Sequence, residues 1–118
     1  MYGLPRDLDL SFFLEKTLLQ VCVGANELIL NFHDRVSITV MSSIGLALFN
    51  GVHRKYESFP EAAGVIVGLL DQTIVSATAG DDGTLSLQFH GGGQVDIYDD
   101  SKQYESYTIT SGDRLFVI

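Results

Sequence analysis

The sequence of 118 residues contains a single cysteine, so an intrachain disulfide is excluded. This residue, Cys22, lies in the apolar run LLQVCV, where we expect a small buried hydrophobic side chain. A chain without disulfides is consistent with a reducing compartment.

Long apolar runs are also missing. Uninterrupted stretches such as LALF, residues 46–49, are far too short to span a bilayer. The N-terminal segment MYGLPRDLDLSFF contains acidic residues and lacks the basic and then apolar pattern of a signal peptide. We therefore expect a soluble cytoplasmic protein that does not bind membranes.

Basic residues are scarce: 7 Lys and Arg stand against 15 Asp and Glu, for a net charge of −8. Residues 1–69 carry seven acidic and five basic side chains, whereas residues 70–118 carry eight acidic and two basic ones. An acidic surface repels nucleic-acid phosphates and anionic lipid. It suits a basic partner, although net charge also serves simply to keep proteins dispersed.

Catalytic motifs are missing around the most conspicuous glycine run, in FHGGGQVDIYDD, residues 89–100. A His-Gly-Gly-Gly run occurs in oxyanion holes of esterases, but the chain has no G-x-S-x-G nucleophile elbow. It has no G-x-x-x-x-G-K phosphate loop either. Residues 90–93 are therefore predicted to form a hairpin turn, as are the corresponding residues 33–36.

What the sequence does contain is an internal repeat. LEKTLLQVCVGANELILNFHDRVSITV, from Leu14, aligns with LDQTIVSATAGDDGTLSLQFHGGGQVDI, from Leu70, so that Thr17 matches Thr73. Further on, KYESF echoes QYESY. We expect one domain over residues 1–118, with a pseudo-repeat of about residues 9–59 and 65–107.

Each repeat shows apolar residues at period two, which is typical of half-buried strands. Examples are Leu28, Leu30 and Phe32 in the first copy and Leu85, Leu87 and Phe89 in the second. Turn residues separate these runs. They are Gly24-Ala25-Asn26, Asn50-Gly51, Gly80-Asp81-Asp82-Gly83 and Ser111-Gly112-Asp113.

Helix is scarce. Pro60 can open a helix whose stripe is Ala63, Ile66, Val67 and Leu70. A shorter helical segment with Leu10, Phe13 and Leu14 on one side follows Asp9, a possible cap. The predicted fold class is mainly β, within α+β. Antiparallel β-meanders from the duplication pack as a sandwich or open barrel, with one or two short helices.

The candidate site residues belong to the acidic, tyrosine-rich segment after residue 95. Alternation places Val95 and Ile97 inward and Asp96 and Tyr98 outward. The carboxylates suit a solvated surface, a protein-binding patch, or a catalytic or Mg²⁺ site. Either Tyr104 or Tyr107 is expected to close the core, because Tyr56 and Phe59 repeat them. The residues predicted to bind a partner are Asp96, Tyr98, Asp99, Asp100, Tyr104 and Glu105.

Two histidines, His33 and His90, occupy matching positions of the repeat and could bind one metal ion. Hairpin ends of different units usually lie apart, and no further Cys or His stands at ligand spacing. We therefore expect no metal, no cofactor and no catalytic residues.

The segment IYDDSKQYESY resembles the Y-D-D-S-x-Q-Y-E-S-Y signature of a family of small, uncharacterised bacterial domains. The start, DLSFFLEKTLLQVCVGANELILNF, is similar to the start of its members, so the resemblance covers nearly the whole chain. These motifs mark the family and are not catalytic. The resemblance implies a role, because related small acidic proteins are often encoded beside polymorphic toxins as immunity proteins. The segment IGLALFNGVHRKY, residues 44–56, departs from the family pattern.

The leading hypothesis is therefore an immunity-type binding protein that neutralises a cognate, basic bacterial toxin. A nuclease would suit such a protein, since carboxylates can mimic phosphates at a basic substrate site. The alternative is a self-associating structural module in which an apolar edge such as IGLALF pairs between subunits. An enzyme is a third reading, which would need His33 or His90 beside carboxylates in a cleft.

Overall fold

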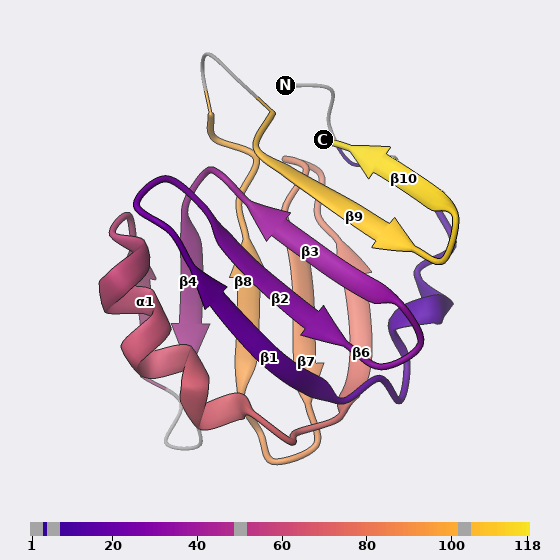
Figure 1. The fold of residues 1–118 in the computed structure, drawn as a ribbon, viewed down its shortest axis with the longest axis horizontal. Coiled ribbons are helices and arrows are strands. Elements are labelled where there is room, and N and C mark those ends of the chain that lie inside the picture. Colours follow the sequence, from indigo (N-terminus) through magenta and orange to yellow (C-terminus); the bar gives the residue numbers. More distant parts are fainter. Residues whose placement is uncertain (1–3, 5–7, 49–51, 102–104) are drawn as a thin grey trace.

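Two five-stranded antiparallel β-sheets make up most of the protein. The computed structural model describes residues 4, 8–48, 52–101 and 105–118. The first sheet has the order β1-β2-β3-β9-β10, and the second has the order β5-β4-β8-β7-β6 (Figure 1). The strands are β1 (Leu18–Val23), β2 (Leu28–Phe32), β3 (Val36–Val40), β4 (Ile44–Ala47), β5 (His53–Tyr56), β6 (Ile74–Ala79), β7 (Leu85–Phe89), β8 (Gln94–Ile97), β9 (Tyr107–Ser111) and β10 (Arg114–Val117).

The two sheets exchange hairpins. The meander β1-β2-β3 is extended by the hairpin β9-β10 from the end of the chain, whereas β8-β7-β6 is extended by β4-β5 from the first half. The halves also exchange backbone hydrogen bonds. The Glu15 N–H donates to Ile74 O at 2.8 Å, and the Asp71 N–H donates to Leu18 O at 2.9 Å. These reciprocal bonds relate matching positions of the predicted repeat, while the duplication itself stays a prediction.

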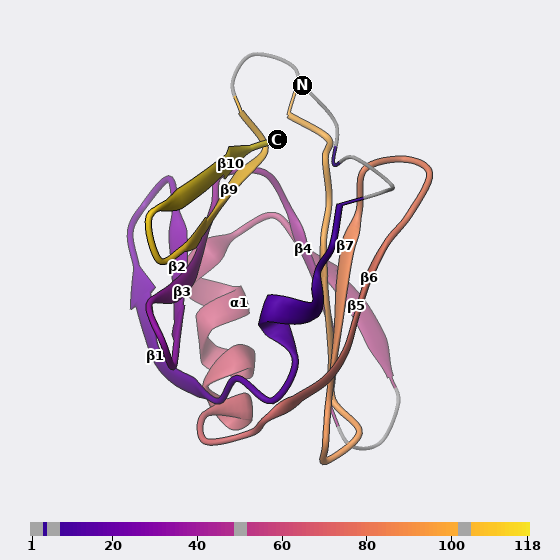
Figure 2. The same ribbon diagram turned by 90° about the vertical axis from the view of Figure 1, so that its right-hand side faces the viewer.

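The core lies between the two sheets, which face each other as two layers with no closed barrel (Figure 2). Side chains at alternate positions meet there, among them Leu30, Ile38, Leu87 and Val95, all fully buried. Burying one such aliphatic side chain contributes about 1.5–3 kcal/mol. The predicted mainly β class with antiparallel meanders is therefore confirmed. The prediction succeeded because alternate residues of the strands are buried, as the period of two in the sequence indicated.

One α-helix, α1 (Phe59–Ile66), occurs in the described part of the chain. Ser58 caps it by accepting a hydrogen bond from the Glu61 N–H at 3.4 Å, and Pro60 occupies its first turn as predicted. The expected stripe is wrong at its end, because the helix tightens into the 3₁₀ turn η2 (Val67–Leu69). Leu69 is thereby buried, while Val67 and Leu70 are exposed.

A second 3₁₀ turn, η1 (Ser11–Phe13), lies where the shorter helix was expected. Leu10 and Phe13 are buried, but Leu14 is exposed, so the prediction that Leu14 extends the same helical side is wrong. The turn ends at Leu14, whose extended backbone directs the chain toward β1. Asp9 accepts a hydrogen bond from the Ser11 N–H at 2.9 Å.

The predicted turns are confirmed at the glycine-containing hairpins of the second half, including residues 80–83 between β6 and β7, where Gly83 adopts a φ of 85°. Residues 90–93 connect β7 to β8, and Gly92 adopts a φ of 95°. Gly112, in the turn between β9 and β10, adopts a φ of 61°. The Asn50-Gly51 pair lies outside the described residues, although the flanking strands β4 and β5 pair antiparallel.

Two expectations about apolar segments are wrong. The run IGLALF contains β4, which pairs with β5 on one side and β8 on the other and is therefore not a free edge. Cys22 is half-buried on the outer face of the first sheet, because a register irregularity between Leu18 and Gln20 places it opposite Ile29. No helix among the described residues is long and apolar enough to cross a membrane.

Candidate binding surface

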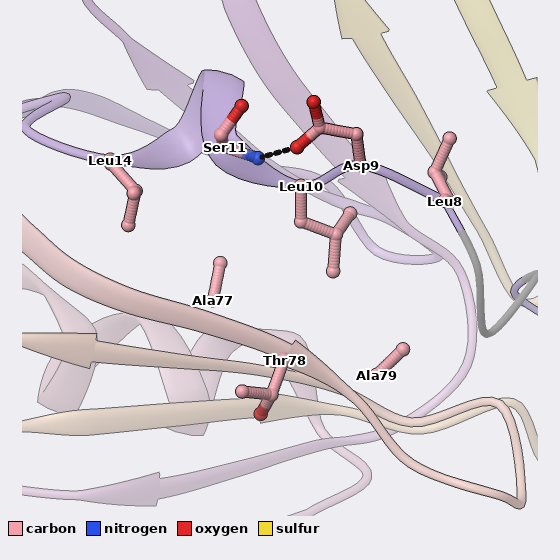
Figure 3. A pocket seen from close by; sticks show the side chains of 8 residues that line it. All are labelled: Leu8, Asp9, Leu10, Ser11, Leu14, Ala77, Thr78 and Ala79. Atoms are coloured by element: carbon pink, nitrogen blue, oxygen red, sulfur yellow. Dashed lines mark hydrogen bonds between the residues drawn. The ribbon is translucent and has the colours of Figure 1, made fainter.

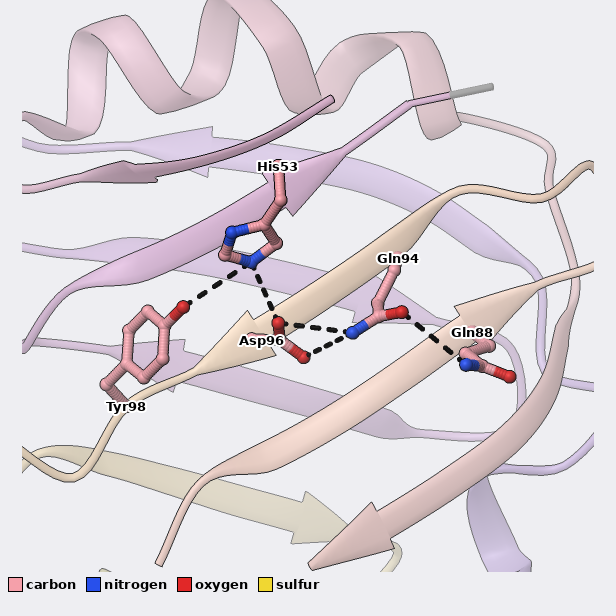
Figure 4. Close-up of polar contacts among 5 residues, drawn as sticks. All are labelled: His53, Gln88, Gln94, Asp96 and Tyr98. Atoms are coloured by element: carbon pink, nitrogen blue, oxygen red, sulfur yellow. Dashed lines mark hydrogen bonds and ion pairs between the residues drawn. The ribbon is translucent and has the colours of Figure 1, made fainter. Parts of the chain in front are cut away.

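The outer face of the second sheet carries a connected polar network over β5, β4, β8 and β7. The Asp96 carboxylate lies at its centre, with Oδ2 2.9 Å from His53 Nε2. Gln94 donates from Nε2 to both Asp96 oxygens, at 3.0 and 3.2 Å. Gln88 donates in turn to Gln94 Oε1 at 3.4 Å, and Tyr98 Oη lies 3.4 Å from His53 Nε2 (Figure 4).

Asp96 faces away from the core as predicted, yet it is only 8% exposed because its neighbours cover it. Burying a carboxylate costs several kcal/mol unless hydrogen bonds replace its water. His53 and Gln94 supply those bonds here. Since an ionised carboxylate only accepts, the His53 Nε2 carries the proton in this contact. The network is thus a satisfied, ordered part of the surface.

Gly45 makes the approach of the two rings possible. In β4 it stands between Lys55 on β5 and Asp96 on β8. A Cβ at this position would lie 2.5 Å from Tyr98 Oη and 2.6 Å from His53 Nε2. Any side chain at position 45 would therefore push both rings aside and disturb the contact between His53 and Asp96.

A second cluster adjoins the network at Asp100. Ser43 Oγ donates to Asp100 Oδ2 at 2.5 Å, and Lys55 Nζ lies 3.1 Å from the same oxygen. Lys55 Nζ also lies 5.2 Å from the centre of the Tyr98 ring, within the range of a cation–π contact. Ser42 Oγ donates to the Tyr98 carbonyl at 2.5 Å, which fixes the backbone of this segment.

The charges of this cluster shift the pKa values of its members. Burial raises the pKa of Asp100, but the hydrogen bonds from Ser43 and Lys55 outweigh it and the net pKa is lowered. The hydrogen bond to Asp100 and its negative charge raise the pKa of Lys55. Burial, and then the charge of Asp96, raise the pKa of Tyr98. At neutral pH Asp100 and Lys55 are therefore charged and Tyr98 is neutral.

A groove opens beside Asp100. A hollow of about 240 Å³ is lined by Met41, Ser42, Ser43, Glu57, Asp100 and Ser101. It shares Met41, Ser42 and Glu57 with a larger hollow of about 620 Å³, which extends to Ala25, Asn26 and Phe59. We call these two adjoining hollows the acidic groove. Carboxylates of Glu57 and Asp100 stand in it beside the apolar side chains of Met41 and Phe59.

Asp99 faces a different part of the molecule. Its Oδ1 accepts a hydrogen bond from Ser106 Oγ at 2.6 Å, just before β9. Its side chain also lies against Gly83, where a Cβ would come within 2.8 Å of Asp99 Oδ2. The fully buried Tyr107 donates from its hydroxyl to the Gly83 carbonyl at 2.8 Å. Asp99 therefore joins the end of β8 to the turn between β6 and β7.

The structure brings only part of the predicted patch together. Asp96, Tyr98 and Asp100 lie on one surface, linked through His53 and Lys55. Asp99 faces Ser106, Glu105 is half-buried, and Tyr104 lies outside the described residues. The prediction that Tyr104 or Tyr107 closes the core is confirmed by Tyr107.

Sequence reasoning missed His53, Lys55 and Gly45. In HRKY, His53 and Lys55 alternate with Arg54 and Tyr56, which is a local signal that both point to one face. Their partners stand 43 or more residues away, so the contact follows only from the pairing of β4 with both β5 and β8.

The other histidines lie at hairpin ends. The His33 N–H donates to Thr17 O at 3.2 Å, and the His90 N–H donates to Thr73 O at 2.8 Å. Over the described ranges, no group of three or more His, Cys, Asp or Glu side chains is arranged to hold a metal ion. The histidine that does meet a carboxylate is His53, which the enzyme hypothesis did not consider.

A separate hollow of about 450 Å³ lies between the η1 segment and edge strand β6 (Figure 3). Its lining is mixed: Leu8, Leu10, Leu14, Ala77 and Ala79 are apolar, and Asp9, Ser11 and Thr78 are polar. Its one acidic residue is Asp9, and the hydrogen bond from the Ser11 N–H lowers the pKa of that carboxyl. A lone exposed carboxylate lacks the partner that acid–base chemistry needs.

The fold and this surface define a two-layer antiparallel β protein with a polar, partly acidic outer face. By sequence, the chain belongs to DUF6188, a family of unknown function, whose family model matches residues 13–118. No curated protein and no solved structure matches the chain.

Proposed function

We propose that this protein is a non-catalytic binding protein that recognises a basic protein partner through the acidic groove and the adjoining network. The observation that carries this proposal is the presence of the Glu57 and Asp100 carboxylates in a groove that also has apolar walls. An Arg or Lys side chain has the matching form, since its stem is apolar and its head is cationic.

The groove is suited to one inserted basic side chain. Its stem would pack on Met41 and Phe59, and its head would meet the two carboxylates and the hydroxyls of Ser42 and Ser43. Charge-assisted hydrogen bonds of this kind are about twice as strong as neutral ones. Lys55 already neutralises part of Asp100, so Glu57 supplies the larger share of the attraction.

The Tyr98 ring and its neighbours extend this contact. The ring is half-buried and held by His53 and Lys55, so little side-chain entropy is lost when a partner covers it. Tyrosine is enriched at protein interfaces for this reason. Together with the groove, it forms a contact in which charge speeds encounter and the ring slows release.

In the cell, we propose, the partner is a toxin that the protein neutralises in the manner of an immunity protein. The net charge of −8 favours association with a basic protein and disfavours nucleic acid. If the toxin is a nuclease, the carboxylates of the groove occupy its phosphate-binding site. Asp96, which His53 links to Tyr98, adjoins this contact. Asp99, Tyr104 and Glu105 stay predicted partner-binding residues.

The test is a pull-down with the tagged protein from its own source organism, followed by co-expression with the partner that is recovered. The double variant Glu57→Gln with Asp100→Asn should weaken binding at least tenfold, measured by calorimetry. Rising salt should weaken the wild-type complex, because screening removes the attraction between opposite charges.

A matched control is Asp34→Asn with Asp113→Asn, which removes the same charge from the exposed hairpin ends of the first sheet. This control should keep affinity within about twofold. Equal loss in both double variants would show that only net charge matters. Failure to protect cells from the recovered protein, with binding intact, would leave a binding protein but reject the toxin-neutralising role.

A further inference from the structure

The outer face of the first sheet carries no charge. At the paired positions, each strand has two outward-facing side chains, as the register of the strand pairs shows. None of these side chains belongs to Lys, Arg, His, Asp or Glu. They are Gln20 and Cys22, Ile29 and Asn31, Ser37 and Thr39, Thr108 and Thr110, and Leu115 and Val117.

This face differs sharply from the outer face of the second sheet. At the position that aligns with Thr39 in the repeat, the second sheet has Asp96, which bonds to His53. Lys55 lies on the same outer row as Asp96. The chain has 22 Lys, Arg, Asp and Glu residues among its 118 residues. A whole sheet face without any charged side chain is therefore a distinct surface.

Among the described residues, no other element covers the face. Figure 1 views the first sheet from its outer side, and its strands lie in front of α1 and of the second sheet. Figure 2 shows α1 and η1 on the inner side. Leu115 is 63% exposed, and the central residues Ser37 and Thr39 are half-exposed.

We propose that two copies of the chain associate through this face, sheet against sheet, about a two-fold axis. Two chains of net charge −8 repel each other, and a contact through a face without charged side chains adds no further repulsion at the contact itself. The outer face of the first sheet is such a face, and no ion loses its hydration when it is covered. Its hydroxyl and amide side chains can bond to their copies across the contact.

The charge pattern also argues against other occupants. A basic partner gains nothing from an uncharged face and is drawn to the acidic groove instead. A second copy presents the same Thr, Ser, Asn and aliphatic side chains. The two contacting surfaces therefore have the same polarity.

The available area is sufficient. A standard interface buries about 800 Å² per partner, which is about an eighth of the 6213 Å² surface of this chain. The molecule measures 32 × 28 × 24 Å, so one broad side can supply that area. Aligned sheets pack about 10 Å apart at about −30°, a geometry that flat outer faces can adopt.

The experiment is sedimentation equilibrium of the full chain over micromolar to millimolar concentration. We expect twice the chain mass of 12.9 kDa at the upper end. Thr39→Glu and Thr39→Lys should each lower the association constant at least tenfold, because a charge of either sign would be buried at the centre of the contact. Gln88→Glu, on the outer face of the second sheet, is the matched control and should leave association unchanged.

Two further readouts keep the result interpretable. Should a central substitution unfold the chain, Leu115→Glu on edge strand β10 tests the same face at an exposed position. Cys22, the lone cysteine, lies on the face, so its reaction with a thiol reagent should slow as dimer forms. Rising salt should strengthen the dimer, whereas it should weaken the basic-partner complex, so the two proposals fail independently.

The proposal is overturned if sedimentation equilibrium gives the mass of a single chain at every concentration. A dimer that survives both Thr39 substitutions overturns it too, since edge-to-edge pairing would leave the central strand uncovered. The proposal is also overturned if the control Gln88→Glu dissociates the dimer as much as the Thr39 substitutions do. It is overturned as well if the chain is monomeric and Thr39→Glu abolishes binding of the basic partner, because the face would then bind that partner.

Discussion

The Thr17 hydroxyl lies 3.1 Å from the Thr73 hydroxyl, and the two residues form an isolated antiparallel bridge between the halves of the chain. Thr17 stands immediately before β1, and Thr73 stands immediately before β6. Glu15 and Asp71, two residues before them, both adopt left-handed backbone conformations with φ of 64° and 71°. The matching positions of the repeat therefore meet one another across a local, approximately two-fold junction.

Removing one hydroxyl at this junction should destabilise the fold. Thr17→Val or Thr73→Val alone leaves a partly buried hydroxyl without its partner, at a cost of about 1–2 kcal/mol. The double variant should cost less than the sum, because neither side then retains an unsatisfied group. Urea unfolding of the four proteins measures this, and strict additivity would contradict the account.

Replacing Gly45 by alanine should destabilise the protein, whereas the same change at Gly64 should stabilise it. At position 45 the new methyl group displaces the rings of His53 and Tyr98. Asp96 then loses its hydrogen bond from His53, which should lower the free energy of unfolding by about 1–3 kcal/mol. Gly64 lies in α1 with no atom within 4 Å of an added Cβ, so alanine gains up to about 1 kcal/mol of helix propensity. Thermal unfolding reports the two signs, and NMR of the His53 ring would show whether its contact is lost.

Acid should remove the contribution of Asp100. Its pKa is lower in the folded protein than the ordinary value of 3.8, so its stabilisation is present above that value. It is lost as the pH falls through the folded-state pKa. Asp100→Asn should therefore be less stable than wild type at neutral pH and approach its stability once the pH lies below the folded-state pKa of Asp100. A difference in unfolding free energy that does not change with pH would contradict this assignment.

Tyr107→Phe should weaken the link between β9 and the turn at Gly83. The phenol is fully buried and donates to the Gly83 carbonyl at 2.8 Å, so its loss should cost about 1–2 kcal/mol. Tyr98→Phe is the comparison, because the Tyr98 hydroxyl lies at the surface and makes only a 3.4 Å contact. In denaturant unfolding, the free energy of unfolding of Tyr107→Phe should be clearly lower than that of Tyr98→Phe.

The fold was accessible from the sequence because burial in strands is a local pattern. In VSITV, alternate residues Val36, Ile38 and Val40 are buried, as period two predicts. The helix prediction failed at Val67 and Leu70 because a 3.6-residue period does not reveal where a helix tightens into a 3₁₀ turn. Cys22 was misplaced for a similar reason, since a register irregularity cannot be read from alternation.

The candidate site was accessible only in part. Asp96, Tyr98 and Asp100 were found because they crowd one short segment. His53 and Lys55 were missed because an apolar run such as IGLALF fits an edge strand and a central strand equally well. Only the central place of β4 brings β5 beside β8.

By itself the sequence determined the strands, their inward faces, the turns and the negative charge, since each follows from neighbouring residues along the chain. The tertiary structure alone decided that the two halves exchange hairpins, that Glu57 and Asp100 share a groove, and that one outer sheet face is uncharged. These features depend on which distant strands become neighbours. Such pairing is set by the packing of the whole core, and no single segment encodes it.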